Sequence, residues 1–292
     1  MGTQRKQKKT ENNEKDSSLW EEILPKPSVF QDYEFPKVSV VVPVYNCAQK
    51  ISLTIDSVIS QYYPDFEIII VDAGSTDRTV EVVKGYRDER IVVYSVSNFQ
   101  PYEMMNKGIS QADGEYINFL FPGDYYLYSE VFTTMMTLAL EENKPSLVYC
   151  GTLLRYGRKE PQILYRNLEE QSLKRGQQPT SLQSCWLHQD VFDKIGKFDT
   201  GLELRGGYDL FCRFHLYDSL DWVSTTRVLT DYDLRLLSKE LVVTHFRETL
   251  RVVFRYFGFS TALRWVLFQK DFRRYFRLWM NGLRVALFGQ SK

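Results

Sequence analysis

The 292-residue sequence lacks the two glycine-rich motifs that mark the commonest nucleotide-binding enzymes. It has no G-x-G-x-x-G after a strand-like run and no G-x-x-x-x-G-K-[ST]. The first motif lets a backbone approach the pyrophosphate of a dinucleotide, and the second wraps the phosphates of a nucleoside triphosphate. Their absence disfavours a dinucleotide-dependent oxidoreductase and a P-loop nucleotidase.

Neither sign of charge predominates, and cysteine is scarce. The chain balances 37 Lys and Arg against 37 Asp and Glu, for a formal net charge of zero. This balance argues against a general nucleic-acid binder. The four cysteines form no C-x-x-C pair. We expect them to be small buried side chains in a reducing compartment rather than disulfides or a zinc site.

Long apolar runs are also missing, since none approaches the roughly 18–20 residues of a membrane-spanning helix. The start of the chain, MGTQRKQKKTENNEKDSS, is charged and has no apolar core of a signal peptide. Lys6 stands where an N-myristoylation motif needs Ser or Thr. We therefore expect residues 1–35 to be a disordered or loosely packed leader and the protein to stay in the cytoplasm.

Apolar, β-branched runs alternate with amphipathic segments over the first half of the chain. Buried strands are predicted at 38–44, 66–71, 91–95 and 116–121, and helices at 48–61, 77–85 and around 104–111. This alternation predicts a parallel sheet with helices on both faces. Ligands bind beyond the carboxyl ends of such strands. The loops of interest are therefore 43–46, 72–77, 97–108 and 121–126.

Five blocks in and beyond these loops resemble the family 2 glycosyltransferases of the GT-A fold. They are VSVVVPVYN (38–46), ISQYYPDFEIIIVDAGSTDRT (59–79), YEMMNKGISQADGEYINFLFPGD (102–124), HQDVFDKIGKFDTGL (188–202) and GGYDLFCRF (206–214). The blocks run in the family's order, and the resemblance covers roughly residues 36–235. The MNKG and GD loops are similar to those of transferases of bacterial surface-polysaccharide assembly.

The resemblance implies an α/β, GT-A type nucleotide-binding domain over residues 36–235 and a transfer reaction. A sugar would pass from a UDP-, GDP- or dTDP-sugar to a saccharide or lipid-linked acceptor, usually with inversion. A divalent cation, Mg²⁺ or Mn²⁺, would bridge the diphosphate, and a carboxylate would deprotonate the acceptor. The main alternative is a nucleotide-sugar-binding relative that has lost turnover and acts as a scaffold or partner subunit. A nucleotidyltransferase is disfavoured because PVYNCAQK, after the first strand, contains no glycine.

The resemblance places donor contacts in the first two loops. Pro43, Tyr45 and Asn46 would lie at the base, where the Tyr45 ring can stack. Asp72 would contact the base or ribose, although many members carry a second acid where this chain has Ala73. Asp72 could instead cap the turn that follows the strand.

The resemblance also assigns the diphosphate and its cation. Asn106 and Lys107 of the MNKG block would lie beside the donor, although Lys107 could equally be a solvated lysine on a helix face. Family members usually hold the metal with Asp-x-Asp or Asp-Asp, where this chain has Gly123-Asp124. One carboxylate is sufficient for Mg²⁺ if water and the diphosphate supply the other ligands. We therefore expect Asp124 to bind the cation, weakly without nucleotide; a turn-forming Asp is the alternative.

The general base has two candidates in this chain. Many members carry an acid at the position of Gly207, so the nearest carboxylate, Asp209, is the first candidate and Glu203 the second. The base has to reach the acceptor hydroxyl directly or through one water. Gly207 and Ala73 are the reasons for keeping the alternative without turnover. His245 is expected on a helix surface rather than among metal ligands.

Residues 236–292 predict a basic, aromatic helical extension. At about 100° per residue, one face holds Lys270, Arg273, Arg274, Arg277 and Arg284, and the other holds Trp265, Phe268, Phe272, Phe276, Trp279 and Leu283. A helix of this kind lies in a membrane interface. We expect peripheral binding to the inner face of the plasma membrane and no nucleic-acid partner. Packing on the catalytic domain or on a second subunit of a homo-oligomer is the alternative.

Overall fold

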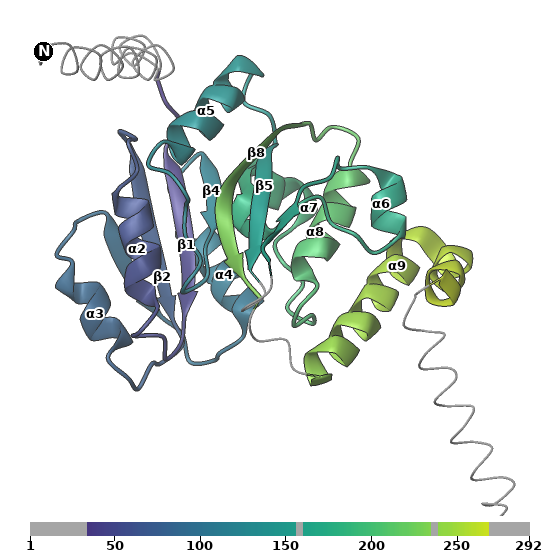
Figure 1. Cartoon of the computed structure of the whole chain (residues 1–292), viewed down its shortest axis with the longest axis horizontal. Coiled ribbons are helices and arrows are strands. Elements are labelled where there is room, and N and C mark those ends of the chain that lie inside the picture. Colours follow the sequence, from purple (N-terminus) through teal and green to yellow (C-terminus); the bar gives the residue numbers. More distant parts are fainter. Residues whose placement is uncertain (1–33, 156–159, 235–238, 269–292) are drawn as a thin grey trace, which may run out of the picture. The chain divides into compact units, whose positions relative to one another are not determined.

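The computed structural model describes residues 34–155, 160–234 and 239–268. The described residues from Pro36 onward belong to one folded unit (Figure 1). Most of the predicted leader, residues 1–35, lies outside the described residues. The predicted division of the chain into this leader, a domain over residues 36–235 and an extension over residues 236–292 stays a prediction.

One mixed sheet of eight strands runs through the described residues. The strands are β1 (Val38–Val44), β2 (Phe66–Asp72), β3 (Ile91–Ser95), β4 (Tyr116–Phe119), β5 (Leu147–Arg155), β6 (Gln162–Leu164), β7 (Cys185–His188) and β8 (Trp222–Asp233). Their order is β3-β2-β1-β4-β7-β5-β6, and β8 pairs with β5. The first four are mutually parallel, as predicted. Beyond them, β7 runs antiparallel to both β4 and β5, which the sequence patterns did not predict.

Helices cover both faces of the sheet. They are α2 (Ile51–Ile59), α3 (Thr79–Gly85), α4 (Pro101–Ile109), α5 (Val131–Glu141), α6 (Glu170–Lys174), α7 (Asp190–Ile195), α8 (Gly206–His215), α9 (Lys239–Phe268) and the short 3₁₀ helix η2 (Leu182–Ser184). Figure 1 shows α2 and α3 in front of the parallel strands. The α4 helix begins three residues before its predicted start, because Pro101 suits a first helical position and the Gln100 side chain accepts a hydrogen bond from the Glu103 N–H.

The main core lies on the face of the sheet away from α2. Alternate residues of the central strands point to this face, since side chains alternate along a strand; they are Val41, Ile69, Val71, Ile117 and Phe119. Buried residues of α4, α7, α8 and α9 join them. Three of the four cysteines are buried and all four are free, as expected.

The α4 helix lies directly on β1. A Cβ atom added to Gly108 of α4 would lie only 2.2 Å from Cγ1 of Val41. Any other residue at this position would therefore clash with the strand. The close contact fixes the position of α4 relative to the carboxyl end of β1.

The α9 helix is interrupted at Gly258, whose φ of 78° and ψ of 174° are not helical. Both of its segments contribute to the core through Val252, Val253, Ala262 and Trp265. Trp265 therefore packs inward, and its indole N–H donates to the Arg175 carbonyl at 2.9 Å. Among the described residues, no helix is long and apolar enough to cross a membrane. The predicted faces beyond Phe268 lie outside the described residues.

Candidate functional site

A cleft of about 510 Å³ lies at the carboxyl ends of the parallel strands. We call it the first cavity. Its walls come from the loops that follow β1, β2, β3 and β4 and from the start of α4. They include Pro43, Tyr45, Asn46, Cys47, Ala48, Gln49, Lys50, Asp77, Phe99, Pro101, Phe121 and Pro122. The predicted position of the site is thus hollow, and three of the predicted donor residues line it.

Two exposed aromatic rings stand at the first cavity. Tyr45 is 42% exposed and Phe99 59% exposed, and their ring centroids are 5.0 Å apart with a 34° angle between the planes. Exposed aromatic rings in a cleft form a surface on which a flat ring can stack. Tyr45 was predicted, whereas Phe99 was missed. An aromatic residue in the polar loop directly after β3 was the signal that could have found it.

The side chain of Asn46 joins the loops after β1 and β2. Its backbone is left-handed, with a φ of 44°, a conformation that Asn adopts more readily than most residues. The Asn46 Oδ1 accepts hydrogen bonds from the N–H groups of Thr76 at 2.8 Å and Asp77 at 3.3 Å. The amide of Asn46 thus orders the wall of the cavity.

Asp72 caps the turn after β2. Its carboxylate accepts hydrogen bonds from the N–H groups of Gly74 and Ser75 and from the Ser75 hydroxyl. Only 4% of Asp72 is exposed, and it does not line the first cavity. Its role as a donor contact stays a prediction, and the geometry favours the turn-capping alternative.

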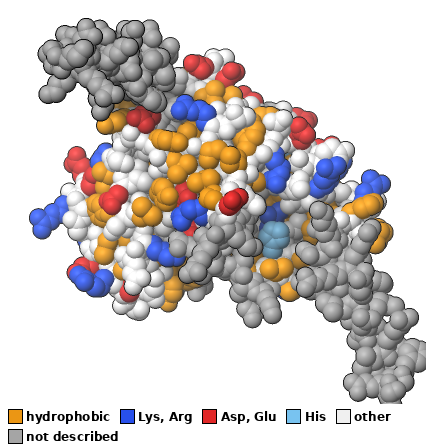
Figure 2. Space-filling view, in the orientation of Figure 1, with side chains coloured by type: hydrophobic (Ala, Val, Ile, Leu, Met, Phe, Trp, Pro, Cys, Tyr) orange, Lys and Arg blue, Asp and Glu red, His pale blue; other side chains and the backbone are white. Residues whose placement is uncertain are grey.

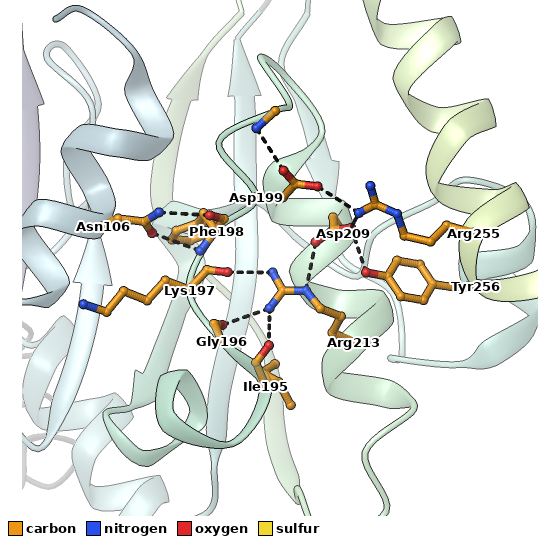
Figure 3. Close-up of polar contacts among 11 residues, drawn as sticks. Asn106, Ile195, Gly196, Lys197, Phe198, Asp199, Asp209, Arg213, Arg255 and Tyr256 are labelled. Carbon is orange, nitrogen blue, oxygen red and sulfur yellow. Dashed lines mark hydrogen bonds and ion pairs between the residues drawn. The ribbon is translucent and has the colours of Figure 1, made fainter.

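Asn106 and Lys107 do not line the first cavity. The amide of Asn106 forms two hydrogen bonds of 2.9 Å with the backbone of Phe198, one to its carbonyl and one from its N–H (Figure 3). The Lys107 ammonium lies 5.6 Å from the centroid of the Tyr94 ring. Both donor assignments stay predictions, and in this structure Asn106 holds the segment before Asp199 against α4.

Asp124 follows β4 in a turn that needs the positive φ of Gly123, 99°. Only 3% of Asp124 is exposed. Its Oδ2 accepts from the Gln183 amide at 2.6 Å, and its Oδ1 accepts from the Asp233 N–H at 3.1 Å. Burial, with smaller contributions from Asp231 and Asp233, raises the pKa of Asp124 to about 7. Both hydrogen-bond donors are uncharged, so a buried charge on Asp124 has no cationic partner from them.

The donor set at Asp124 fits a divalent cation only together with a bound diphosphate. Among the described residues, no group of three or more His, Cys, Asp or Glu could hold a metal ion. The single carboxylate is consistent with a hard cation that takes its remaining ligands from phosphate and water. The assignment of Asp124 as metal ligand therefore stays a prediction with a chemically suitable residue.

A second cavity of about 240 Å³ adjoins the first, and the two share Pro101 and Phe121 in their walls. Glu203, an exposed acid, is among the residues that line it. The loop that carries Glu203 is held by Glu248 of α9, whose carboxylate accepts from three successive backbone N–H groups at 2.8–3.0 Å. Glu248 was not predicted, and its long sequence separation from the loop left no local signal.

Side chains already occupy the space around the two glycines at the start of α8. A Cβ atom at Gly207 would lie 3.0 Å from Cγ of Leu182, and one at Gly206 would lie 2.6 Å from the Tyr102 ring. Gly207 itself lines the second cavity. The position where the family carries an acid is therefore close to the cavity but tightly packed by Leu182.

Asp209 is fully buried and its carboxylate is fully engaged (Figure 3). One oxygen accepts from Arg213 at 2.9 Å, and the other accepts from Arg255 at 3.1 Å and from the Tyr256 hydroxyl at 2.9 Å. Asp209 does not line either cavity described here. Its role as general base stays a prediction, and the geometry favours Glu203.

Comparison with known sequences finds a family model, Glycosyl transferase family 2, that matches residues 39–198. An uncharacterized glycosyltransferase of Rickettsia typhi is 32% identical over 189 residues, which cover 61% of this chain and 58% of that protein. A PGL/p-HBAD biosynthesis glycosyltransferase of Mycobacterium bovis is 27% identical over 227 residues, covering 76% of this chain and 78% of that protein. The match to the Rickettsia relative thus spans less than two thirds of that relative's length.

Solved structures show the same architecture. S. aureus TarS in complex with UDP has a TM-score of 0.59 at 21% identity, covering 74% of this chain and 64% of that chain. The mannosyltransferase PcManGT from Pyrobaculum calidifontis in complex with GDP-Man and Mn²⁺ has a TM-score of 0.54 at 16% identity, covering 88% and 82%. At these identities the likeness shows the fold, which is the predicted GT-A type.

Replacement of Asp124 by Asn should change how stability depends on pH. With a folded-state pKa of about 7, Asp124 keeps a proton that the unfolded chain releases near pH 4. The stability of the wild type should therefore fall as the pH rises between these two values. Asp124→Asn cannot ionise and should lose less stability over that range. Thermal unfolding with a chelator present measures this, and parallel pH profiles would contradict the expectation.

Replacement of Asp209 by Ala should lower the free energy of unfolding, because it leaves Arg213 and Arg255 without their buried carboxylate acceptor. Breaking such a pair costs about 3–5 kcal/mol, and the partial exposure of both arginines places this case at the lower end. Denaturant unfolding measures the loss, with Asp190→Ala, an exposed acid on α7, as the matched control. An Asp209 variant as stable as that control would show that the network is not structural.

Proposed function

Because the chain belongs to glycosyl transferase family 2, we propose that it transfers a sugar from a nucleotide-diphosphate donor to a saccharide or lipid-linked acceptor. The observation that carries this proposal is the pair of adjoining cavities at the carboxyl ends of the strands. The first has aromatic rings at its wall and the second a carboxylate. A nucleotide in one and an acceptor in the other would bring the reacting atoms together at the shared wall of Pro101 and Phe121.

The first cavity suits the nucleotide of the donor. Its volume of about 510 Å³ falls within the roughly 300–1,000 Å³ of small-molecule sites. A nucleobase would stack beside Tyr45 and Phe99, and Asn46 would keep the surrounding loops in place. The related structures contain UDP and GDP-Man, which supports a UDP-, GDP- or dTDP-sugar as the donor class.

The second cavity suits the acceptor, with Glu203 as the general base. In the proposed step, the acceptor hydroxyl oxygen forms a bond to the anomeric carbon while the bond from that carbon to the phosphate oxygen breaks. Glu203 takes the hydroxyl proton, and the nucleoside diphosphate leaves with the bonding electron pair. A single displacement of this kind inverts the anomeric carbon. Glu203 is suited to proton transfer because it lines the cavity while Glu248 fixes its backbone.

Asp124 would hold a divalent cation, Mg²⁺ or Mn²⁺, together with the diphosphate. When bound, the cation would offset the negative charge of the leaving group. The Mn²⁺ in the mannosyltransferase structure supports this assignment. Asp124 is oriented for the role by Gln183 and the Asp233 N–H.

The alternative without turnover rests on Gly207 and Ala73, which replace acids of the family. Glu203 supplies another carboxylate at the second cavity, and the relatives are named glycosyltransferases. These observations favour transfer over binding alone. The resemblance of the MNKG and GD loops, and a relative named for PGL/p-HBAD biosynthesis, support a place in bacterial surface-polysaccharide assembly.

The exposed side of α9 suits an anionic lipid surface, which would place the enzyme on the inner face of the plasma membrane. Exposed apolar residues of α9 include Val242, Val243, Phe246, Phe254, Phe259, Leu263, Leu267 and Phe268. Exposed arginines accompany them, at positions 247, 251 and 264. Where α9 ends in Figure 1, Figure 2 shows basic and apolar side chains next to one another. Apolar burial together with basic charge is the combination by which peripheral helices bind anionic membranes.

Glu203→Gln should lower turnover by roughly 100- to 10,000-fold, the range of general base catalysis, while nucleotide affinity stays unchanged. Release of nucleoside diphosphate from a panel of UDP-, GDP- and dTDP-sugars measures turnover, and calorimetry measures affinity. Glu142→Gln, an exposed acid at the end of α5, is the matched control. Full activity in Glu203→Gln would exclude it as the base. A wild type that binds nucleotide but never turns over would support the binding-only alternative.

Phe259→Ser combined with Leu263→Ser should reduce binding to vesicles of phosphatidylglycerol and phosphatidylcholine. The wild type should sediment with these vesicles, and added salt should weaken the binding because arginines contribute. Ile163→Ser, at an exposed apolar position on β6, is the matched control. Equal sedimentation of the double variant and the wild type would contradict a lipid-binding role for this part of α9.

A further inference from the structure

Lys50 lies between two parts of the site that a bound nucleoside diphosphate would span. One is the aromatic pair of Tyr45 and Phe99, and the other is the turn that carries Asp124. Lys50 directly precedes α2 and lines the first cavity, together with Tyr45 and Phe99. Among the described residues that line this cavity, it carries the only positive charge. The sequence analysis did not single it out, because a lysine before a helix has no distinctive local pattern.

The side chain of Lys50 lies against the turn that carries Asp124. A Cβ atom added to Gly123 would meet three carbons of Lys50: Cδ at 3.4 Å, Cβ at 3.7 Å and Cγ at 3.9 Å. The lysine stem thus runs over the glycine that stands where the family usually carries a second metal-binding acid. Where many family members have a second carboxylate, this chain therefore has the aliphatic stem of Lys50.

The charge of Lys50 is not neutralised within the described part of the chain, where it forms no ion pair. Of the described residues in the wall of the first cavity, Asp77 is the one acid. Its oxygens already accept hydrogen bonds from the N–H groups of Ala48 at 3.1 Å and Thr79 at 2.9 Å. A cationic side chain in the wall of a cleft without an anionic partner attracts an anionic ligand.

From this geometry we propose that Lys50 binds the diphosphate of the donor. The inference rests on the proposed function, since it assumes that a nucleotide occupies the first cavity. With the base beside Tyr45 and Phe99, the phosphates would extend past Lys50 toward the turn of Asp124. A lysine binds phosphate as a point charge. A single carboxylate at Asp124 would hold a divalent cation only weakly. Lys50 would therefore supply positive charge that a weakly held cation does not.

This role has a consequence for metal dependence. Part of the charge of the diphosphate would be balanced by a covalently attached group rather than by a cation. The chain should therefore prefer nucleoside diphosphates over nucleosides even when divalent metal has been removed. Lys50 would also stabilise the charge that develops on the diphosphate as it leaves.

The test measures calorimetric affinity for UDP, GDP and dTDP, each beside its own nucleoside, with EDTA present. The wild type should bind one diphosphate more tightly than its nucleoside. Lys50→Met should lose roughly 10- to 100-fold of the affinity for that diphosphate, as expected for a hydrogen bond to a charged group. Its affinity for the nucleoside should not change, and Lys50→Arg should retain most of the preference. Lys84→Met, at an exposed lysine on α3, should behave as the wild type.

The outcomes separate the two proposals. A Lys50→Met protein that keeps the full preference for the diphosphate would overturn the role of Lys50 and leave the proposed function standing. A wild type that binds neither nucleotides nor nucleosides, with or without Mn²⁺, would overturn the proposed function together with this inference. Equal loss of diphosphate and nucleoside in Lys50→Met would show that Lys50 shapes the cavity rather than binding phosphate.

Discussion

The carboxylate of Asp209 is the interaction on which the second half of the site depends. A carboxylate without exposure to water is costly unless charged and polar groups surround it. Here its partners come from two helices, with Arg213 from α8 and Arg255 and Tyr256 from α9. Arg213 also donates to the carbonyls of Gly196 and Lys197. One buried group thus joins both helices to the segment after α7.

Asp124 is the opposite case of a buried carboxylate. Its hydrogen-bond donors are an amide and a backbone N–H, neither of them charged. The neighbouring acid Asp231 does have a charged donor, because Arg155 forms two hydrogen bonds of 2.5 Å with it. Asp124 has uncharged donors instead, and its burial raises its pKa to about 7. A buried carboxylate of this kind at the end of a strand is suited to a ligand that brings its own positive charge.

Much of the first half of the fold was predictable, because its signals are local. Runs such as residues 38–44 and 91–95 became strands with the predicted bounds, and the loops after them form the cleft. The antiparallel strands and the loop of Glu203 were not predictable in the same way. Their positions depend on contacts such as Asn106 with Phe198 and Glu248 with Glu203, which join residues far apart in the chain.

Motif resemblance alone does not decide what a side chain contacts, for a physical reason. It identifies which residues recur at a position, and the same amide can bind a ligand or a neighbouring backbone. Asn106 lies on α4, in the predicted MNKG block, but its amide forms its hydrogen bonds with the backbone of Phe198. Asp209 is the nearest acid to Gly207 in the sequence, yet two residues of helix, about half a turn, place it in the core rather than at the cavity. Lys50 required the folded cleft, because nothing adjacent to it marks it as a ligand contact.

The close contact between Gly108 of α4 and the side chain of Val41 on β1 limits how the first cavity can change shape. With only the Val41 side chain between them, α4 and β1 cannot slide or separate without losing their packing. The wall of the first cavity that α4 and β1 form is therefore rigid. If the cavity widens or narrows around ligands of different size, the change has to come from the loop of residues 45–50, which carries the aromatic ring of Tyr45 and the positive charge of Lys50.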